Sequence, residues 1–542
     1  MTSKILQICQ KPATLALLMT ILAIIPQQSI QSTSIDEFNI VTGTCTYGYM
    51  PLNIYTCTLS NVPILNPTDV LEITGNHLPG HIDADVQAVN HQSSTITFFN
   101  GEILRKFVNL RRIQIFEQGL REFGPNAFEF CPHLEELLTA LDPQLTSLPP
   151  QMMRNCQNLQ SFAVVVHSLV TIPEDLFGTT RSLVEFNVGS NQLSSIPANL
   201  LQNMANLRRF NVASNLLSQL SSNLLRNAVN LEEFNVASNR FVDQQIIVNI
   251  LNGHLNLKRL WLNNNNFILF DFRFMAQFQN LIELSVGSSL GQRLTGISWQ
   301  SLSSSLTTLR IDGIGEEIPG NAFSQLFNLN SLTFNGPGIT SLHRDTFSTL
   351  SRLEHLTIQN TNIRTLHPEL FLSQASLLNL NLYSNQIESL PAGIFTPLIN
   401  IGAITSMFGI RLVSNNIQKL NMNSFGQHPH LRHIDFLLNR INEIERGIFG
   451  RFATTLNYAG FGSNVCISRT IFNGVNLDND DRLTLCFNNW AGITTSVAAT
   501  STTSTTVAPD DIQTTTPNGC GINFRKFEGF VIIFIGFLLS FW

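Results

Sequence analysis

The chain has 542 residues, of which only 13% are charged, and its formal net charge is −6. No run of lysine and arginine exceeds two residues, which argues against nucleic acid as a partner. A chain of this length suggests about three or four domains, but an internal repeat, described below, replaces that expectation with one extended core.

The first 34 residues have the features of a secretory signal peptide. Lys4 and Lys11 make the start of this segment positive, and an apolar run of 13 residues extends from Ala13 to Ile25. Ser32 and Ser34 are small residues suited to cleavage. A membrane-spanning helix would instead need about 20 apolar residues. We therefore predict that residues 1–34 are removed and that the protein is secreted.

Residues 35–109 are predicted to form an N-terminal cap and degenerate first coils. A cap is expected because the end coil of a repeat stack has no neighbour to cover its core. Cys45 and Cys57 are positioned to close the cap with a disulfide, since secretion exposes the chain to an oxidising environment. Val70–Ile73 and Ile96–Phe99 have the apolar character of strands in the opening coils.

Residues 110–463 repeat the pattern LxxLxLxxNxLxxLPxxxFxxLxNL, which is that of leucine-rich repeats. The first apolar residue of each copy, numbered position 1, recurs every 24 or 25 residues, apart from single steps of 23, 26 and 30. Strands alternate their side chains, so positions 4 and 6 face inward and positions 3, 5 and 7 face outward. No copy can bury its apolar residues alone, so the copies must stack. The copies, 14 repeats and the start of a fifteenth, begin at Leu110, Leu134, Leu159, Leu183, Leu207, Leu231, Leu257, Leu281, Leu306, Leu329, Leu353, Leu377, Met407, Leu431 and Leu456.

Asparagine at position 9 is predicted to be structural. Its side chain can hydrogen-bond the backbone of the turn that leaves the strand and of the adjacent coil, where polar groups would otherwise be buried unpaired. These asparagines are therefore not expected to form a binding site. They are Asn191, Asn215, Asn239, Asn265, Asn385, Asn415, Asn439 and Asn464.

Two further cysteine pairs fit the same frame. Cys131 and Cys156 each precede position 1 of a repeat by three residues, so they lie on adjacent coils, about 4.8 Å apart in a parallel sheet. A disulfide is expected there, although two stacked buried thiols would also fit. Cys466 and Cys486 would close a C-terminal cap over residues 464–490. No CxxC or HxxxH motif accompanies the cysteines, so no metal site or cofactor is predicted.

The outward strand positions predict two different regions. At position 3, acidic and basic residues alternate with one interruption from Arg112 to Glu283, so neighbouring strands are expected to pair their charges. From Trp261 onward the outward residues become aromatic and charged, as in protein-binding surfaces. An ordinary solvated sheet face is the alternative for any one residue. The predicted partner-binding residues on the concave face are Trp261, Arg310, Asp312, His355, Gln359, Tyr383, Arg411, His433 and Asp435.

After residue 490 the composition changes. Residues 491–518 are predicted to form a stalk, since 13 of the 23 residues from Thr494 to Thr516 are Ser or Thr. Residues 519–542 end in an apolar tail, Gly529 to Trp542, and resemble a glycosylphosphatidylinositol (GPI) anchor signal or a short membrane tail. The predicted site of lipid attachment is Asn518 or Gly519, with Cys520, which has no predicted disulfide partner, as the alternative.

Together these features resemble the extracellular leucine-rich-repeat family of the typical 24-residue class, over roughly Cys45 to Cys486. The resemblance includes Toll-like ectodomains and lipid-anchored arthropod proteins of the connectin and chaoptin type. It implies an α/β fold, a horseshoe-shaped solenoid with a long parallel sheet on the concave face and disulfide caps at both ends. Each cap here has two cysteines where the family commonly has four, and no intracellular signalling domain follows the repeats.

The expected function is protein binding on the outer face of the plasma membrane, or after secretion, in cell-surface recognition or adhesion. The partner would be a protein ligand or a cell-surface protein, including a second copy of this chain. Alternatives are an innate-immune co-receptor that recognises microbial patterns and a non-catalytic subunit that stabilises a secreted enzyme. Gly287–Gly291 fits the GxSxG motif of hydrolases, but Ser289 occupies repeat position 9 rather than a strand-to-helix elbow. We therefore expect no enzymatic activity.

Overall fold

The computed structural model describes residues 40–492, except for 61, 63–68, 92–95, 117–118, 289–292, 404–408, 453–455, 468–470 and 473–476. The chain divides into two compact units, Met1–Ile493 and Thr494–Trp542, and all described residues belong to the first. The predicted signal peptide, the lipid-anchor segment and nearly all of the predicted stalk lie outside the described residues. In the described part, no helix has the length and apolar character needed to cross a membrane.

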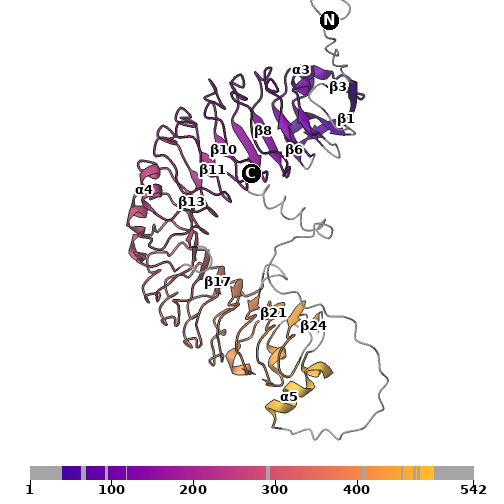
Figure 1. Ribbon diagram of the computed structural model, residues 1–542. Coiled ribbons are helices and arrows are strands. Elements are labelled where there is room, and N and C mark those ends of the chain that lie inside the picture. The colour runs from indigo at the N-terminus through magenta and orange to yellow at the C-terminus, as the bar shows by residue number, and fades with distance from the viewer. Residues whose placement is uncertain are drawn as a thin grey trace, which may run out of the picture. The chain divides into compact units, whose positions relative to one another are not determined.

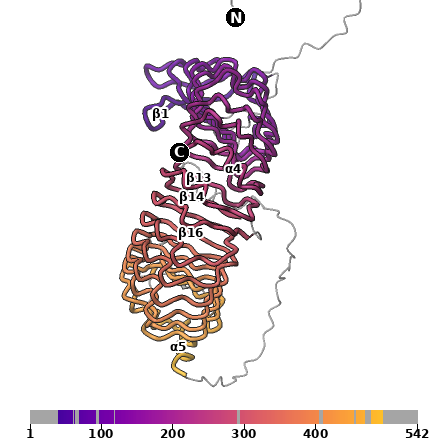
Figure 2. The backbone as a smooth tube through the Cα atoms, turned by 90° about the vertical axis from the view of Figure 1, so that its left-hand side faces the viewer, coloured from indigo at the N-terminus to yellow at the C-terminus, as the bar shows by residue number. Residues whose placement is uncertain are grey.

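A sheet of 20 strands among the described residues lines the concave side of a curved stack of coils (Figure 1). Turned by 90°, the first unit shows its coils lying one behind another from β1 to α5 (Figure 2). The strands that pair in parallel along the stack are β4 (Ala88–His91), β6 (Arg112–Phe116), β8 (Glu136–Ala140), β9 (Ser161–Val165), β10 (Glu185–Asn187), β11 (Arg209–Asn211), β12 (Glu233–Asn235), β13 (Arg259–Trp261), β14 (Glu283–Gly287), β15 (Thr308–Asp312), β16 (Ser331–Asn335), β17 (His355–Gln359), β18 (Asn379–Asn381), β19 (Ile410–Arg411), β21 (His433–Asp435) and β23 (Tyr458–Gly460).

The register of this sheet confirms the predicted repeat alignment. Each predicted copy supplies one strand, which begins two or three residues after position 1. Residues at position 4 pair with position 4 on the next coil, as Phe186 does with Phe210 and Leu380 with Ile410. The parallel-sheet solenoid expected from the period of the repeat is therefore present.

The opening coils differ in part from the sequence prediction. β1 (Ile40–Met50) and β2 (Ile54–Ser60) form an antiparallel hairpin, and the predicted strand at Val70 is present as β3 (Val70–Thr74), parallel to β1. The strand that continues the main sheet is β4, which pairs with β2 and β6. The segment expected at Ile96–Phe99 gives only β5 (Phe98–Phe99), which pairs with β7 (Glu122–Phe123) in a separate sheet. Its phenylalanines are buried beside the main sheet rather than within it.

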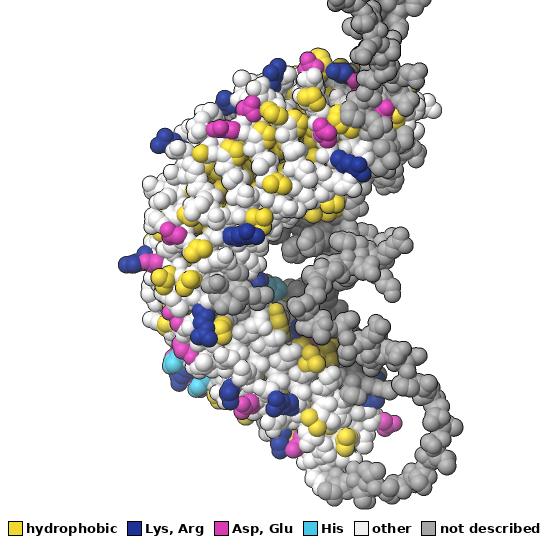
Figure 3. Space-filling model, in the orientation of Figure 1, with side chains coloured by type: hydrophobic (Ala, Val, Ile, Leu, Met, Phe, Trp, Pro, Cys, Tyr) yellow, Lys and Arg dark blue, Asp and Glu magenta, His cyan; other side chains and the backbone are white. Residues whose placement is uncertain are grey.

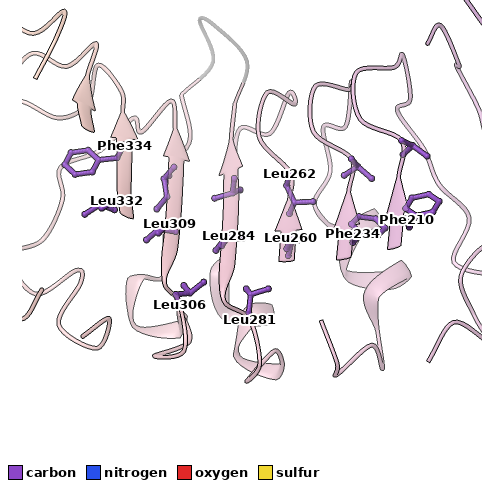
Figure 4. Close-up of a cluster of buried hydrophobic side chains, with 14 of the residues drawn as sticks. Phe210, Phe234, Leu260, Leu262, Leu281, Leu284, Leu306, Leu309, Leu332 and Phe334 are labelled. Atoms are coloured by element: carbon purple, nitrogen blue, oxygen red, sulfur yellow. The ribbon is translucent and has the colours of Figure 1, made fainter. Parts of the chain in front are cut away.

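Inward residues fill the space between the sheet and the outer turns with one continuous core. Phe162, Phe186, Phe210 and Phe234 occupy position 4 on adjacent strands, with consecutive ring centroids 6.1, 5.9 and 5.4 Å apart. Leucine continues the same row from Leu260 onward (Figure 4). Because each side chain covers those of the next coil, no coil has a core of its own.

The position-9 asparagines form a ladder of hydrogen bonds. Each of the eight predicted side chains accepts a backbone N–H of the preceding coil at 2.9 to 3.1 Å. Each also donates to a carbonyl of the preceding coil at 2.8 to 3.1 Å. The prediction that these residues are structural is confirmed. Asp142 and His167 occupy position 9 in two earlier coils, where Asp142 accepts from the Gly119 and Leu120 N–H groups.

The outer side of the stack consists mainly of turns with short helices. The longest step within the regular part of the array, from Leu231 to Leu257, accommodates α4, which buries Ile247, Ile250 and Leu251 at helical spacing.

A second, unpredicted set of asparagines lies just before position 1 and donates to carbonyls one coil earlier, as Asn158 does to Pro132 at 2.6 Å. The remaining elements are α3 (Glu102–Lys106), α4 (Gln245–Leu251), α5 (Thr484–Trp490), β20 (Lys419–Leu420), β22 (Glu443–Ile444), β24 (Ile471–Phe472), and the 3-10 turns η1 (Pro51–Asn53), η2 (Asp83–Asp85), η3 (Phe272–Gln277), η4 (Trp299–Ser301), η5 (Met422–Ser424), η6 (Ile448–Arg451), η7 (Leu477–Asn479) and η8 (Asp481–Leu483).

All three predicted disulfides are present. Cys45–Cys57 joins β1 to β2 in the N-terminal cap, and Cys466–Cys486 joins the last coil to α5. Cys131–Cys156 links adjacent coils with a Cα separation of 4.9 Å, so the alternative of two free stacked thiols does not apply.

Candidate functional site

Outward residues from β10 to β14 largely interact with one another. Arg209 lies 2.7 Å from Glu185, and Arg259 contacts both Glu233 and Glu283. These ion pairs confirm the expected pairing of charges at position 3. At position 5, the Asn211 side-chain oxygen accepts the N–H of Ala213 at 3.0 Å. Asn187 and Asn235 do the same in the neighbouring coils.

The predicted partner-binding residues occupy three rows of the sheet, and Asp312, Gln359 and Tyr383 belong to the position-7 row. The register places Trp261, Arg310, Arg411 and Asp435 in the position-5 row, and His355 and His433 in the position-3 row. Between the strands of Arg310 and Arg411, position 5 carries only small or uncharged side chains, Thr333, Thr357 and Asn381. The position-5 row therefore has chemically rich ends and an uncharged centre, whereas His355 and Tyr383 lie between these ends in the other two rows.

One end of this surface is organised around Trp261 and Arg310. The indole N–H of Trp261 donates to Glu283 Oε1 at 2.8 Å. Arg310 Nε donates to Asp312 Oδ2 at 2.7 Å, and the Asn335 amide also donates to Asp312. Each large side chain is thus held by an acidic partner, which fixes its direction on the sheet.

The other end is a cluster on β19, β21 and β23. Arg411 Nε lies 3.4 Å from His433 Nε2, and the His433 ring stacks on Tyr458 with centroids 4.4 Å apart. Burial raises the pKa of Asp435, whereas the Leu437 N–H, nearby Arg411 and the Tyr458 hydroxyl act in the opposite direction. Burial and the Asp435 charge both raise the pKa of Tyr458. The structure therefore brings Arg411, His433 and Asp435 together, and Tyr458 completes a group that sequence reasoning missed.

Accessibility divides the predicted residues into two groups. Asp312, Gln359 and Asp435 are buried, at 4, 9 and 8% exposure, and lie beneath the accessible surface. The residues that remain partly exposed are Trp261, Arg310, His355, Tyr383, Arg411 and His433. A partner on this face would contact the second group, while Asp312 and Asp435 would position their arginine neighbours.

An apolar cluster on β8 and β9 was not anticipated. Leu138, Ala140, Ala163 and Val165 occupy outward positions 5 and 7, yet they are buried and form a cluster separate from the main core. The signal was available in the sequence, because β8 is apolar at both outward positions after Glu136 and β9 is apolar at every position after Ser161. The alternation of charges at position 3 predicts only ion pairing in this part of the face.

Among the described residues, no group of three or more His, Cys, Asp or Glu side chains is placed to hold a metal ion. Ser289 of the GxSxG motif lies outside the described residues.

On the face visible in Figure 3, acidic and basic side chains are interspersed along the outer rim.

Coils of about 24 residues, stacked in register on one parallel sheet and joined by an asparagine ladder, define a leucine-rich-repeat solenoid with an open concave face. The chain belongs to the leucine-rich-repeat family. The family model for the BspA type leucine rich repeat region matches in 6 copies, over residues 85–192, 121–258 and 300–413.

No curated protein matches the chain in sequence. Among solved structures, a leucine-rich-repeat protein of Leptospira interrogans is 21% identical, with 68% of this chain and 83% of that chain covered and a TM-score of 0.49. A structure of the Toll–Spatzle complex of Drosophila is 15% identical, with 76% and 65% covered and a TM-score of 0.46. At these identities the similarity concerns the fold alone.

Proposed function

We propose that this protein is an extracellular, membrane-anchored binding module that holds a protein partner on its concave face between β13 and β21. The observation that carries the proposal is the row of partly exposed aromatic and basic side chains on one continuous sheet. The row crosses seven strand spacings, a span of ~34 Å at ~4.8 Å for each strand. That length suits a protein partner better than a small molecule, whose pocket would be more compact.

The chemistry of the row fits protein recognition. Tryptophan, tyrosine and arginine dominate binding energy at protein interfaces, and Trp261, Arg310 and Arg411 are of these types. Glu283 holds Trp261 and Asp312 holds Arg310 in fixed directions, so little entropy of these two side chains is lost when a partner binds. Between the two ends, the short side chains of Thr333, Thr357 and Asn381 in the position-5 row leave room for the partner to approach the sheet.

Location outside the cell is part of the proposal. Three disulfides support it, because such bonds persist in oxidising compartments. We further propose that residues 1–34 direct secretion and that a lipid at Asn518 or Gly519 holds the protein on the membrane. Treatment of expressing cells with a phosphatidylinositol-specific phospholipase tests the anchor, because a GPI-anchored protein would be released and a protein with a membrane-spanning tail would stay on the cells.

Binding is tested with the released intact protein as a labelled probe on cells. Trp261→Ala and Arg411→Ala each remove one partly exposed anchor and should weaken binding at least about tenfold, equivalent to about 1.4 kcal/mol. Asn211→Ala, at the same repeat position in the self-paired region, is the matched control and should bind as the wild type does. Equal binding by all four proteins would exclude the proposed surface.

The same probe separates the kinds of function. Aggregation of expressing cells, lost in the two concave-face variants, would indicate adhesion between copies of this chain. Copurification with a secreted enzyme or retention of a microbial glycolipid would point to the other two functions instead.

A further inference from the structure

A half-open cavity of about 480 Å³ lies in the N-terminal cap, on the flank where the first strands begin. Tyr49 and Tyr55 of the β1–β2 hairpin form one side, and Asp85 of η2 forms another. Arg111 and His133, which precede β6 and β8, complete the far side. The volume falls within the range of ~300 to 1,000 Å³ found for small-molecule sites.

Stacked rings give this cavity a rigid aromatic wall. Tyr49 pairs with Tyr55 across the hairpin, with ring centroids 5.4 Å apart. The His81 ring stacks on Tyr55 at 4.2 Å, and its Nε2 lies 2.8 Å from the Tyr49 hydroxyl. The Tyr55 hydroxyl also accepts the Leu78 N–H at 3.1 Å. Tyr49 is nevertheless 55% exposed, so a ligand in the cavity can reach its ring.

Several polar side chains that line the cavity have unused hydrogen-bonding capacity. Those of Asn53, Gln87 and His133 make no hydrogen bond with any described residue. Asp85 uses Oδ2 to accept the Ile82 N–H at 2.9 Å. Arg111 lies 3.3 Å from Glu135 and is still more than half exposed. Carboxylate, amide, imidazole and guanidinium groups therefore surround one aromatic face.

This combination selects the chemistry of the ligand. Each sugar hydroxyl both donates and accepts, which suits a mixed lining of acceptors and donors, and the C–H face of a sugar ring packs on an aromatic ring. An anionic ligand would meet the Asp85 carboxylate, and an apolar one would leave Asn53 and Gln87 unpaired. We propose that the N-terminal cap binds a neutral sugar residue in the cavity between Tyr49, Asp85 and Arg111.

The proposed sugar site is separate from the concave protein-binding surface. It lies beside the starts of β2, β4, β6 and β8, whereas Trp261 lies on β13. Eight strand spacings separate β2 from β13, or ~38 Å along the sheet. Loss of one activity should therefore leave the other unchanged.

Saturation-transfer NMR on the intact protein tests this site. The probes are galactose, glucose, mannose and N-acetylglucosamine, with glucuronic acid and sialic acid as charged counterparts. We expect transfer to at least one neutral sugar and a loss of affinity of at least about tenfold in Tyr49→Ala and in Asp85→Asn. Tyr383→Ala, a tyrosine on the concave face, is the matched control and should bind the sugar as the wild type does.

Two further variants keep the test independent of folding. Gln87→Ala and His133→Ala remove accessible side chains that make no hydrogen bond with any described residue, so their thermal unfolding should match the wild type while sugar affinity falls several-fold. Absence of transfer to every neutral sugar would overturn the proposal. Binding of the charged sugars alone, or affinity for a neutral sugar unchanged in all four cap variants, would overturn it as well.

Discussion

Substitution of Asn215 by alanine should destabilise the solenoid far more than a typical surface change. Asn215 is 6% exposed, its Nδ2 donates to the Val188 carbonyl at 3.0 Å, and its Oδ1 accepts the Leu193 N–H at 2.9 Å. Alanine would leave the Leu193 N–H buried without a partner, at about 1 to 3 kcal/mol, whereas the Val188 carbonyl would still accept from Asn191 Nδ2 at 3.0 Å. A loss of about 1 to 3 kcal/mol is a substantial share of the 5 to 15 kcal/mol that typically stabilises a domain.

The assay must report locally, because coils of a repeat array can unfold without the rest of the stack. Urea unfolding of the intact, oxidised protein gives the total change, and hydrogen exchange at the Leu193 amide gives the local one. Asn211→Ala is the control, since Asn211 is partly exposed and its side chain accepts only the Ala213 N–H, so the loss should stay below about 1 kcal/mol. If Asn215→Ala proved as stable as Asn211→Ala, with the Leu193 amide equally protected, the ladder would not stabilise the coils as argued.

Three further changes probe the core, a buried histidine and the charged rows. Phe210→Ala removes a ring whose centroid lies 5.9 Å from that of Phe186 and 5.4 Å from that of Phe234. This change should lower the free energy of unfolding by about 3 to 5 kcal/mol in urea titrations, and a loss below about 1 kcal/mol would contradict this packing. Burial lowers the pKa of His91 to about 3, so as pH falls below about 6.5 the unfolded state binds a proton before the folded state does. By pH 4.5 the free energy of unfolding should fall by about 3 kcal/mol. His91→Leu should reduce this loss when unfolding is measured across pH. Arg209→Ala breaks a partly exposed ion pair with Glu185 and should lower the free energy of unfolding by less than about 1 kcal/mol. High salt should diminish this loss, and a loss that does not depend on salt would contradict an electrostatic origin.

The period of the repeat was sufficient to predict the array, because it determines where each strand begins, which residues pair between strands and which residues face the core. Leu183 and Leu207 are 24 residues apart, and the strands after them pair in the expected register. The disulfide between Cys131 and Cys156 followed from the same arithmetic. Once position 1 is known in each copy, strand alternation determines which residues face inward.

The coil of β4 escaped prediction because its residues depart from the pattern. Val86 and Val89 stand where leucine is usual, and the buried inward residue at position 6 is His91. The apolar segment at Ile96–Phe99 was the more obvious strand, yet its phenylalanines pack beside the sheet. Apolar character alone does not distinguish a strand of the main sheet from a buried turn next to it.

The candidate site was predictable in its rows and less so in its contacts. Repeat position placed Arg411 and Asp435 side by side, which the register reproduces. Position could not indicate that Asp312 would be buried under Arg310, or that Tyr458 would stack on His433. These depend on side-chain directions set by neighbours one coil away. The tyrosine and histidine stacks of the cap were equally hidden, since the cap does not follow the repeat.

Different repeat positions have different structural roles, which explains how one fold can present different surfaces. Positions 4 and 6 fill the main core and position 9 satisfies the backbone, so in most coils positions 3, 5 and 7 are not needed for either purpose. Around Arg209 these free positions pair with one another and present a closed ionic row, whereas at Arg411 they hold an arginine, a histidine and a tyrosine in one accessible group. Since both arrangements rest on the same backbone, the difference between them reflects no requirement of folding. Under the proposed function, binding of a partner is the requirement that places Trp261 and Arg411 on the open face, where burial contributes little to stability.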